Sequence, residues 1–533
     1  MFRILLQQAR RDRITLPIWI LGTVLLIVTV ANTVVSEFSD AESRANILAV
    51  ALATPALLAL RGIPHGDSLG SALHFQSFAF LALTIGLMNV FLATRHGRAD
   101  EEKGRRELVL ATPVSRLTPP LATLILGVIA NGIFVALAVG GYVGAGVPTD
   151  GAVLSGVTLG VTGLAFLGLA MLAGELTETS RAANGIGVVL VLGSYALRAA
   201  GDALGRADIQ NLTLEPAWPS WISPIGWGQQ TLAFTENRWW PVALLAGLAV
   251  VGAVVALLIH SRRDLGAGLL PERGGPATAL PTLASPLALA WRLQWPTIIA
   301  WTIGSALIGF LLGQLVTAVA NVSFANPQIQ AILQSLAHSS DTDLSATLIG
   351  ALMVIVGAVA AAAGVQAILR MREEESDGRL EAVLATPGSR AAWLLSFASV
   401  AAATVLIVLL GTGIASAIGF AILGDADSAW LAFWSALVQA PAALTFVGVT
   451  VLLFGLLPRA SIGLGWGVFG VLAVIGLFGG LLGLSDDAEK ISPITSVPAL
   501  PTDDWVPTLI VAGVAVGTTL LGVLAFRRRD LTT

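Results

Sequence analysis

The chain has 533 residues, of which 55% are hydrophobic and only 12% are charged, and its mean hydropathy is +0.83. Soluble domains carry about 25% charged residues, so this composition excludes a soluble enzyme and predicts an integral membrane protein. The lack of cysteine excludes disulfides, zinc fingers, iron–sulfur clusters and a cysteine nucleophile. A net charge of −4 is too small to indicate a nucleic-acid partner.

Twelve charge-free stretches are long enough to cross a bilayer, which takes about 20 apolar residues. In the first half they are Ile14–Val35, Ser71–Thr94, Leu117–Thr149, Gly151–Gly174, Ala182–Leu197 and Trp239–Ile259. In the second half they are Leu293–Val322, Leu344–Leu369, Ala391–Gly424, Ser428–Pro458, Ala460–Ser485 and Trp505–Phe526. The sequence therefore predicts an all-α integral membrane protein with about 12 transmembrane helices.

Two further segments are interpreted as external helices that lie on the membrane. The first, Ala45–Leu60, is apolar but short and contains Pro55. The equivalent region of the second half is amphipathic, because four apolar residues fall on one helix face; they are Ile329, Ile332, Leu333 and Leu336. Five tryptophans in a later outer segment are interpreted as interfacial anchors; they are Trp218, Trp221, Trp227, Trp239 and Trp240.

The basic residues predict the orientation, because inner loops of membrane proteins are rich in Lys and Arg. With both termini inside, only six of the 29 basic residues lie outside, namely Arg44, Arg61, Arg198, Arg206, Arg238 and Lys490, which leaves 23 inside. The sequence thus predicts a multi-pass membrane protein with both termini in the cytoplasm. Two lysines against 27 arginines, with much Ala and Gly, are typical of a GC-rich bacterial gene, so the membrane is expected to be the bacterial plasma membrane.

One polar segment occurs twice. Residues 101–116, EEKGRRELVLATPVSR, recur at an offset of 274 as residues 375–390, ESDGRLEAVLATPGSR, with eleven of sixteen positions identical. Weaker echoes pair Arg10–Trp19 with Arg292–Trp301, Ile222–Ile225 with Ile491–Ile494, and Arg262–Leu265 with Arg528–Leu531. We therefore expect two parallel six-helix domains, residues 1–265 and 291–533, joined by a Gly- and Pro-rich cytoplasmic linker, residues 266–290.

Each copy of this segment is predicted to be a short helix on the inner membrane face. Gly104 and Gly378 mark a bend, the Thr-Pro pairs at 112–113 and 386–387 end the helix, and Ser115 and Ser389 cap the next one. The charged side chains of Glu101, Arg105, Glu107, Glu375, Arg379 and Glu381 are expected to face the cytosol. A single such segment would be a solvated loop, but its duplication in a diverged chain favours a docking surface.

The duplicated segment resembles the coupling element of ABC-2 type export permeases, in which a Glu-rich, Gly-containing stretch precedes Pro-x-Ser-Arg. Nearly the whole chain is similar to double-length permeases that export polyketide antibiotics or other drugs, and Arg262–Pro271 adds to the resemblance. The resemblance implies a separate cytoplasmic ATP-binding subunit, in two copies, that binds ATP and Mg. It would dock on Glu101, Glu102, Gly104, Arg105 and Glu107, and on Glu375, Gly378, Arg379 and Glu381. The copies differ in charge, with net zero over Arg98–Glu107 and −3 over Arg372–Glu381, which leaves the equivalence of the two contacts open.

The chain itself is expected to bind no cofactor. A phosphate-binding P-loop needs Gly-Lys followed by Ser or Thr, but Lys103 precedes Gly and Lys490 precedes Ile, and these are the two lysines of the chain. The five histidines lack metal-ligand spacing, so no metal site is expected.

Few polar residues occur inside the predicted spans, and none of the spans contains Asp, Glu, Lys or Arg in its interior. Each polar residue is more readily explained by a hydrogen bond between helices than by a ligand contact; they are Asn32, Gln76, Asn89, Asn131, Gln314, Gln366 and Gln439. Asn32, Gln76, Asn89, Gln314 and Gln366 are also candidates for a substrate path. A path this apolar suits a hydrophobic or amphipathic small molecule that enters from the lipid bilayer.

These observations favour the permease subunit of an ATP-driven exporter that moves such compounds out of the cell. The alternative is a secondary, ion-coupled transporter, since twelve spans in two parallel halves also fit that class. Ion-coupled carriers usually need charged residues inside the membrane as relays, which argues against it. A membrane-embedded enzyme has no catalytic constellation to support it.

Overall fold

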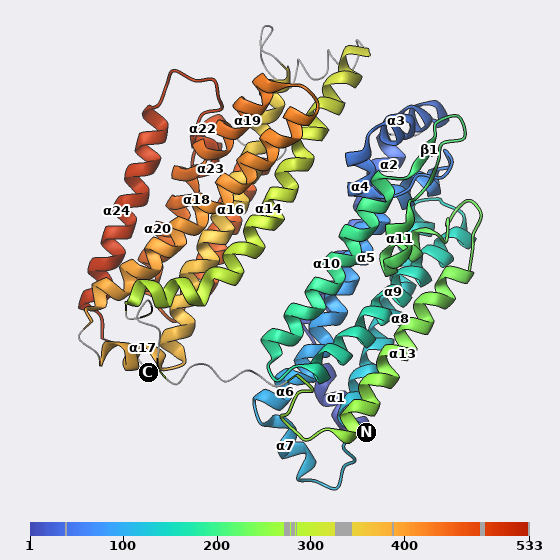
Figure 1. Ribbon diagram of the computed structural model, residues 1–533, viewed down its shortest axis with the longest axis horizontal. Helices are drawn as coiled ribbons and strands as arrows, with labels where there is room; N and C mark the ends of the chain where they lie inside the picture. Colours follow the sequence, from blue (N-terminus) through green and yellow to red (C-terminus); the bar gives the residue numbers. More distant parts are fainter. Residues whose placement is uncertain are drawn as a thin grey trace. The chain divides into compact units, whose positions relative to one another are not determined.

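The computed structural model (Figure 1) describes residues 1–37, 40–270, 278, 283, 285–325, 344–385, 388–479 and 485–530. The chain forms two compact units, Met1–Gly275 and Pro276–Thr533, which we call unit 1 and unit 2. The boundary between them falls inside the stretch 266–290 that the sequence predicts to be a linker.

Unit 1 consists of helices and one β-hairpin. Its helices are α1 (Phe2–Arg11), α2 (Thr15–Glu37), α3 (Ala41–Ala53), α4 (Pro55–Arg61), α5 (Leu69–His96), α6 (Arg98–Glu102), α7 (Arg105–Leu110), α8 (Thr118–Gly144), α9 (Thr149–Leu176), α10 (Ser180–Ala203), α11 (Trp218–Ile222), α12 (Pro224–Gln229) and α13 (Trp240–Arg262). The hairpin pairs β1 (Arg206–Asp208) antiparallel to β2 (Thr213–Glu215), with Arg206 opposite Glu215.

Helix α9 occupies the centre of unit 1, where it contacts α5, α8 and α13. A Cβ atom added to Gly168 of α9 would lie 2.7 Å from the carbonyl oxygen of Ala249 on α13, so the two backbones touch. Such close approach through small residues is a common way for membrane helices to pack. The space between α5, α8 and α9 is filled by the buried rings of Phe78, Phe134 and Phe166.

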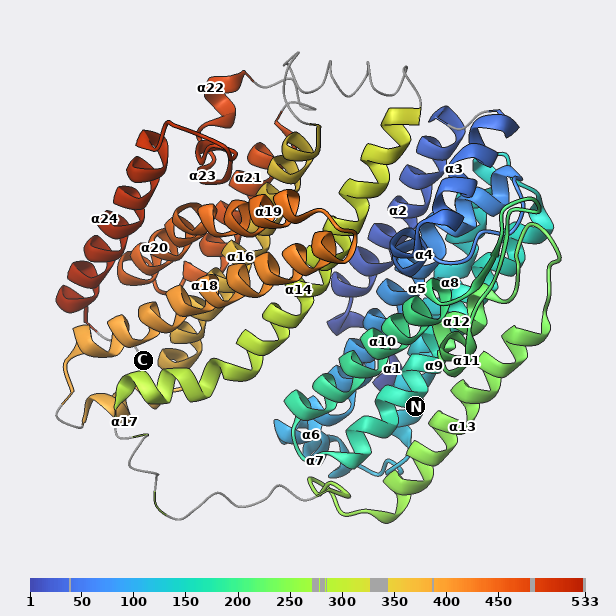
Figure 2. The same ribbon diagram turned by 45° about the horizontal axis from the view of Figure 1, so that its top comes forward.

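Unit 2 has a comparable set of helices. They are α14 (Pro286–Ala325), α16 (Leu344–Ser376), α17 (Arg379–Leu384), α18 (Arg390–Ile422), α19 (Ala426–Val438), α20 (Ala440–Leu456), α21 (Ser461–Phe478), α22 (Asp486–Glu489), α23 (Pro493–Ser496) and α24 (Val506–Arg528). Helix α14 lies along α18, and α20 along α24 (Figure 2). The α20–α24 contact uses glycine as the α9–α13 contact does, since a Cβ on Gly455 would lie 2.6 Å from the carbonyl oxygen of Gly522.

Eleven helices in the described part of the chain are long and apolar enough to cross a membrane, or twelve if the bent pair α3–α4 is one span. The predicted all-α membrane fold is therefore confirmed. Two spans differ from the prediction. Helix α10 is longer than Ala182–Leu197 and continues through Arg198 and Asp202. The described part of Ala460–Ser485 holds α21, which is too short to count among the eleven. The stretch Ser428–Pro458 is confirmed as one span, Ala426–Leu456, whose helix is interrupted at Gln439.

The segment Ala45–Leu60 forms α3 and α4, which are bent by 105° relative to each other. The bend falls at Thr54, whose backbone is extended because Pro55 disfavours the helical conformation of the preceding residue. The segment is therefore helical but divided in two, and its place on the membrane surface stays a prediction. The two helices bury apolar side chains against the start of α5 and the hairpin; this cluster includes Leu48, Leu52, Leu58, Phe75 and Leu214. The second-half counterpart, residues 329–336, lies outside the described residues.

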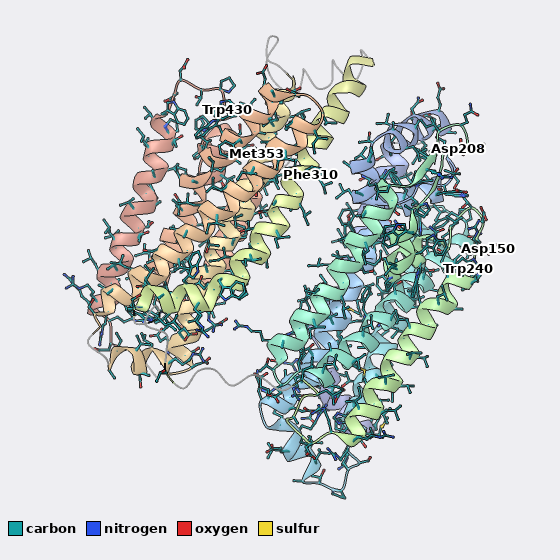
Figure 3. All side chains as sticks on the ribbon, viewed as in Figure 1. Asp150, Asp208, Trp240, Phe310, Met353 and Trp430 are labelled. Atoms are coloured by element: carbon teal, nitrogen blue, oxygen red, sulfur yellow. The ribbon has the colours of Figure 1, made fainter. Side chains whose placement is uncertain are left out.

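In each unit the repeated segment lies at one end of the long helices, which we call the repeat end (Figure 1). Helices α1, α6 and α7 lie at the repeat end of unit 1, and α17 lies at that of unit 2. Asp208 and Trp240 mark the opposite end of unit 1, and Trp430 marks the opposite end of unit 2 (Figure 3). At that end of unit 1, the half-exposed Trp221 and Trp240 rings stack with their centroids 5.8 Å apart.

Candidate functional site at the repeat ends

The repeated segment turns at a glycine in both units, as predicted. Gly104 and Gly378 have φ angles of +66° and +73°, a left-handed conformation that glycine adopts without strain. Each glycine immediately precedes a six-residue helix, α7 or α17. Ser389 caps α18 by accepting a hydrogen bond from the amide of Ala392 at 3.1 Å, also as predicted. Ser115 does not cap α8, because that helix begins at Thr118, followed by two prolines.

Helices α7 and α17 present charged side chains to the outside of their units. Glu107 and Glu381 are exposed, and the side chains of Arg105 and Arg379 are about half exposed. Leu108 is 75% exposed and makes α7 partly apolar on its outer face. These positions lie where the sequence predicts them, and a macromolecule could reach them.

Glu101 is buried, which corrects the expectation that it faces the cytosol. It belongs to α6 and accepts hydrogen bonds from Arg98 at 2.5 Å, from Arg263 at 2.7 Å and from Arg106. Its side chain is 2% exposed. A buried carboxylate is stable only when it is paired and hydrogen-bonded, and three guanidinium groups meet that requirement here.

Arg263 connects Glu101 to a second buried carboxylate. It follows the last residue of α13 and also donates through Nε to Glu175, near the end of α9. His260 lies 3.0 Å from the same carboxylate. Burial acts to lower the pKa of Arg263, but the hydrogen bonds and charges of Glu175 and Glu101 outweigh it and raise that pKa. The network therefore joins α6, α9 and α13 at the repeat end.

The same connection recurs in unit 2. Glu375, at the end of α16, is buried and accepts hydrogen bonds from Arg529, just after α24, and from Arg372 at 3.1 Å. Glu375 is the repeat counterpart of Glu101, and Arg529 is the counterpart of Arg263. The expectation that Glu375 faces the cytosol is therefore also wrong. In each unit the first glutamate of the repeat binds the second arginine of the Arg-Arg-Asp-Leu sequence.

A second hydrogen bond occurs in both units at the same distance. Arg116 donates to the carbonyl oxygen of Arg263 at 2.7 Å, and Arg390 donates to the carbonyl oxygen of Arg529 at 2.7 Å. Each unit thus ties both ends of the repeated segment to the end of its last long helix. Sequence reasoning missed this role, although the Arg-Arg-Asp-Leu echo was a signal that could have indicated it.

The surroundings of the two buried glutamates differ. Arg106 contacts Glu101 in unit 1, but its counterpart Leu380 is a buried apolar residue. His260 of unit 1 corresponds to Phe526, which packs with Trp393, Phe397 and Phe454 in an aromatic cluster. The Arg529 guanidinium lies 5.0 Å from the Phe454 ring centre and 5.1 Å from that of Phe526. Burial in this apolar cluster lowers the pKa of Arg529.

Further polar contacts attach α1 and α10 to the repeat end of unit 1. Asp12, after α1, is bonded to Arg95 and to His96 Nε2, the latter at 2.5 Å. Burial acts to raise the pKa of Asp12, but His96 and Arg95 outweigh it and lower that pKa. Glu102 is exposed yet accepts the Ser180 amide at 2.9 Å, at the first residue of α10.

Asn89, a candidate for the substrate path, is buried against another helix. Its amide exchanges hydrogen bonds with that of Asn131, at 3.1 and 2.8 Å. Each amide also donates to a carbonyl oxygen four residues earlier in its own helix. The pair is a contact between α5 and α8, which agrees with the interpretation that polar residues in spans bond to other helices.

The structure describes the side chains of three other candidate path residues, each within its own unit. Gln76 accepts a hydrogen bond from Arg61 at 2.8 Å, near the start of α5. Gln366 is exposed on unit 2 and accepts from the indole of Trp301 at 2.6 Å. Asn32 is exposed on α2 of unit 1, and the side chain of Gln314 lies outside the described ones.

A buried ion pair lies near the end of α10, beyond the predicted span Ala182–Leu197. Arg198 and Asp202 are fully buried and lie 3.1 Å apart. Arg198 also donates to the carbonyl oxygen of Ala59 at 2.7 Å, and Asp202 accepts from the Ser220 hydroxyl at 2.6 Å. The pair holds the end of α4 and the start of α11 against α10.

Nearly the whole chain is similar in sequence to a known permease. It is 33% identical over 530 residues to the multidrug efflux system permease protein Rv1217c of Mycobacterium tuberculosis (strain ATCC 25618 / H37Rv). The aligned region covers 98% of this chain and 93% of that protein. Residues 283–527 also match the family described as multidrug efflux system permease Rv1217c, C-terminal domain.

Proposed function

Since this chain belongs to the family of multidrug efflux system permeases, we propose that it is the membrane-spanning subunit of an ATP-driven exporter of the ABC-2 type. As a permease it is a transporter rather than an enzyme, and it is a multi-pass membrane protein. Its cargo consists of hydrophobic or amphipathic compounds, which it moves out of the cell. Units 1 and 2 correspond to two fused six-helix domains.

One observation carries the proposal more than any other. Each unit has a short exposed helix whose base is fixed by a buried ion pair, Glu101–Arg263 or Glu375–Arg529. When a docked partner displaces such an exposed helix, the buried ion pair transmits the displacement to the membrane helices. A solvated loop would have no need of such an anchor.

The anchors define which helices would move together. Glu101 precedes α7, and Arg263 extends from the end of α13 and also contacts Glu175 on α9. In unit 2, Arg529 extends from the end of α24 and donates to the carbonyl oxygen of Phe454 on α20 at 3.0 Å. A displacement of α7 or α17 would therefore reach the central and last helices of its own unit.

The driving energy comes from a separate subunit. Two copies of a cytoplasmic ATP-binding protein would bind ATP and Mg and dock on α7 and α17, chiefly through Glu107 and Glu381. The repeat ends then face the cytoplasm, in keeping with the concentration of arginines there. Both termini would also be cytoplasmic, because α1 starts at the repeat end and α24 finishes there.

For the ion-coupled alternative, a candidate relay away from the repeat end is the buried Arg198–Asp202 pair. That pair already binds the backbone of α4 and the Ser220 hydroxyl. Its contacts therefore assign it to holding three helices together, which does not favour a proton relay.

Reconstitution in liposomes tests the proposal. The chain alone, under an imposed proton gradient, should move no cargo such as a lipophilic dye. After addition of the ATP-binding subunit, ATP should support transport, whereas a hydrolysis-deficient form of that subunit should not. Proton-driven transport by the isolated chain would overturn the exporter proposal and support the secondary transporter.

A further inference from the structure

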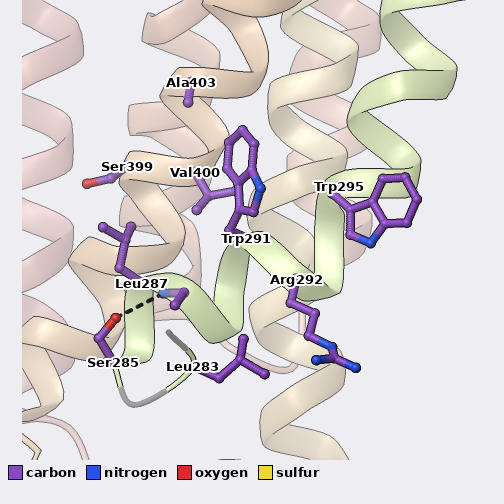
Figure 4. A pocket seen from close by; sticks show the side chains of 10 residues that line it. Leu283, Ser285, Leu287, Trp291, Arg292, Trp295, Ser399, Val400 and Ala403 are labelled. Atoms are coloured by element: carbon purple, nitrogen blue, oxygen red, sulfur yellow. Dashed lines mark hydrogen bonds between the residues drawn. The ribbon is translucent and has the colours of Figure 1, made fainter. Parts of the chain in front are cut away.

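Unit 2 has a surface groove of about 710 Å³ between the start of α14 and the first half of α18. Leu287, Trp291 and Trp295 line it from α14, and Ser399, Val400 and Ala403 line it from α18. Figure 4 shows the Trp291 ring beside Val400, with Trp295 and the Arg292 guanidinium on one side of α14. The groove lies at the repeat end of its unit, because α14 begins there.

The polar groups of the groove lie near the start of α14. Ser285 caps this helix by accepting the Ala288 amide at 3.2 Å. The side chain of Arg292 is exposed, and no hydrogen bond or ion pair within the described part of the chain involves it. A guanidinium that lacks a carboxylate partner suits a phosphate oxygen. Trp291 and Trp295 are 43% and 49% exposed, which is typical of tryptophans at the level of lipid headgroups.

An apolar stripe continues from the groove along the same helix. Ile299, Ile303 and Leu307 follow Trp295 at four-residue intervals and are 45%, 58% and 58% exposed. From Arg292 to Leu307 the helix rises about 22 Å at 1.5 Å per residue. The hydrocarbon core of a bilayer is about 30 Å thick, so the stripe is long enough to accompany an acyl chain through one leaflet.

The corresponding place in unit 1 provides a comparison within the same chain. There a smaller groove of about 360 Å³ lies between α8 and the α1–α2 segment. By the repeat offsets, Ala9 takes the place of Trp291 and Ile129 that of Ala403. The unit 1 groove is therefore narrower on the α8 side and lacks that tryptophan.

We propose that the unit 2 groove binds one glycerophospholipid with an anionic headgroup, drawn from the leaflet at the repeat end. Arg292 contacts the lipid phosphate, Trp291 and Trp295 flank the glycerol region, and an acyl chain lies along the stripe of α14. The positive charge of Arg292, which has no partner among the described residues, and the continuous apolar stripe together favour this occupant over a fully apolar or a cationic molecule. The inference does not depend on the proposed coupling to ATP.

Native mass spectrometry of the full-length protein in detergent, titrated with phosphatidylglycerol, tests this assignment. The wild type should bind one molecule most tightly. Two changes should each weaken that site at least tenfold, Arg292→Gln by removing the phosphate contact and Ala403→Ile by filling the groove as Ile129 does in unit 1. Arg292→Lys should retain most of the binding. Arg10→Gln, at the unit 1 position equivalent to Arg292, should leave the site unchanged.

Melting temperatures equal to that of the wild type would show that the variants are folded. Diacylglycerol, which lacks the phosphate, should not compete with phosphatidylglycerol for the tight site. Unchanged lipid binding in both unit 2 variants, or equal competition by diacylglycerol, would overturn the proposal. Displacement of the lipid by transported compounds in wild-type protein alone, with the same variants losing transport, would instead assign the groove to the cargo.

Discussion

The two repeat ends share an ion pair and differ in most of what surrounds it. In unit 1 the shared glutamate, Glu101, lies among three arginines and close to the His260–Glu175 pair. In unit 2 the shared arginine, Arg529, lies against the aromatic rings of Phe454 and Phe526. The same glutamate–arginine ion pair thus has polar surroundings in unit 1 and apolar surroundings in unit 2. Both units therefore keep the ion pair that fixes the short helix, α7 or α17, whereas the residues packed around that ion pair have diverged.

The largest expected effect is a loss of stability on substitution of the buried glutamates, and it should differ between Glu101 and Glu375. Glu101→Ala leaves Arg98 and Arg106 buried without a carboxylate partner, although Arg263 keeps Glu175, and removal of one partner from a buried pair costs about 3–5 kcal/mol. Glu375→Ala should cost less, about 1.5–3 kcal/mol, because Arg529 keeps the Phe454 carbonyl oxygen and its aromatic contacts. Melting temperatures in detergent should therefore fall further for Glu101→Ala. The exposed Glu107→Ala serves as the matched control and should not change the melting temperature.

Equal losses for the two substitutions would contradict this comparison. They would indicate that the extra arginines of unit 1 add nothing to the burial of Glu101.

The second prediction concerns the exposed helices. A charge-assisted hydrogen bond contributes about 1.5–3 kcal/mol, so the double change Glu107→Ala and Glu381→Ala should weaken association with the ATP-binding subunit by tenfold or more. The melting temperature of the isolated chain should stay the same, because both side chains are exposed. Copurification and ATP turnover of the complex measure the effect.

The single variants then compare the two units. If the contacts are equivalent, Glu107→Ala and Glu381→Ala each cause half of the loss in binding free energy. A loss confined to one of them would show that the charge difference between the copies matters. Unaltered copurification and turnover in the double variant would count against docking at these residues.

The third prediction converts a position of unit 1 to its unit 2 counterpart. Arg106→Leu removes one of the three arginines around Glu101, which keeps Arg98 and Arg263. The loss in stability should be about 1.5 kcal/mol, the value of a weak charge-assisted hydrogen bond, and thus smaller than for Glu101→Ala. Thermal unfolding measures it, with the exposed neighbour Arg105→Leu as control. A loss as large as that of Glu101→Ala would mean that Arg106 alone satisfies the carboxylate.

The sequence predicted the parts of this site that depend on local chemistry. A glycine between charged residues indicated the bend, and Glu107 and Glu381 are exposed as expected. The burial of Glu101 could not be predicted in the same way, because Arg263 lies 162 residues further along the chain. Both residues look like ordinary loop charges until the fold brings the end of α13 beside α6. The length of α10 likewise depends on packing, because Arg198 and Asp202 are buried against neighbouring helices. The break at Gln439 instead has a local cause, since Pro441 removes a helical hydrogen bond and its ring clashes with the preceding turn.

The smallest expected effect is the loss of stability when the glycine of the bend is replaced, and it should be the same in both units. Gly104 and Gly378 have nearly the same left-handed φ, and a Cβ added to either would meet no atom within 4 Å. Alanine at either position therefore tests the backbone alone, and the left-handed conformation costs an L-residue about 1–2 kcal/mol. Gly104→Ala and Gly378→Ala should lower the melting temperature by the same small amount. Asparagine, which tolerates this conformation better, should restore part of the loss in both. Unequal losses, or no recovery with asparagine, would mean that the bend is held by its surroundings and that the divergence between the units reaches the turn itself.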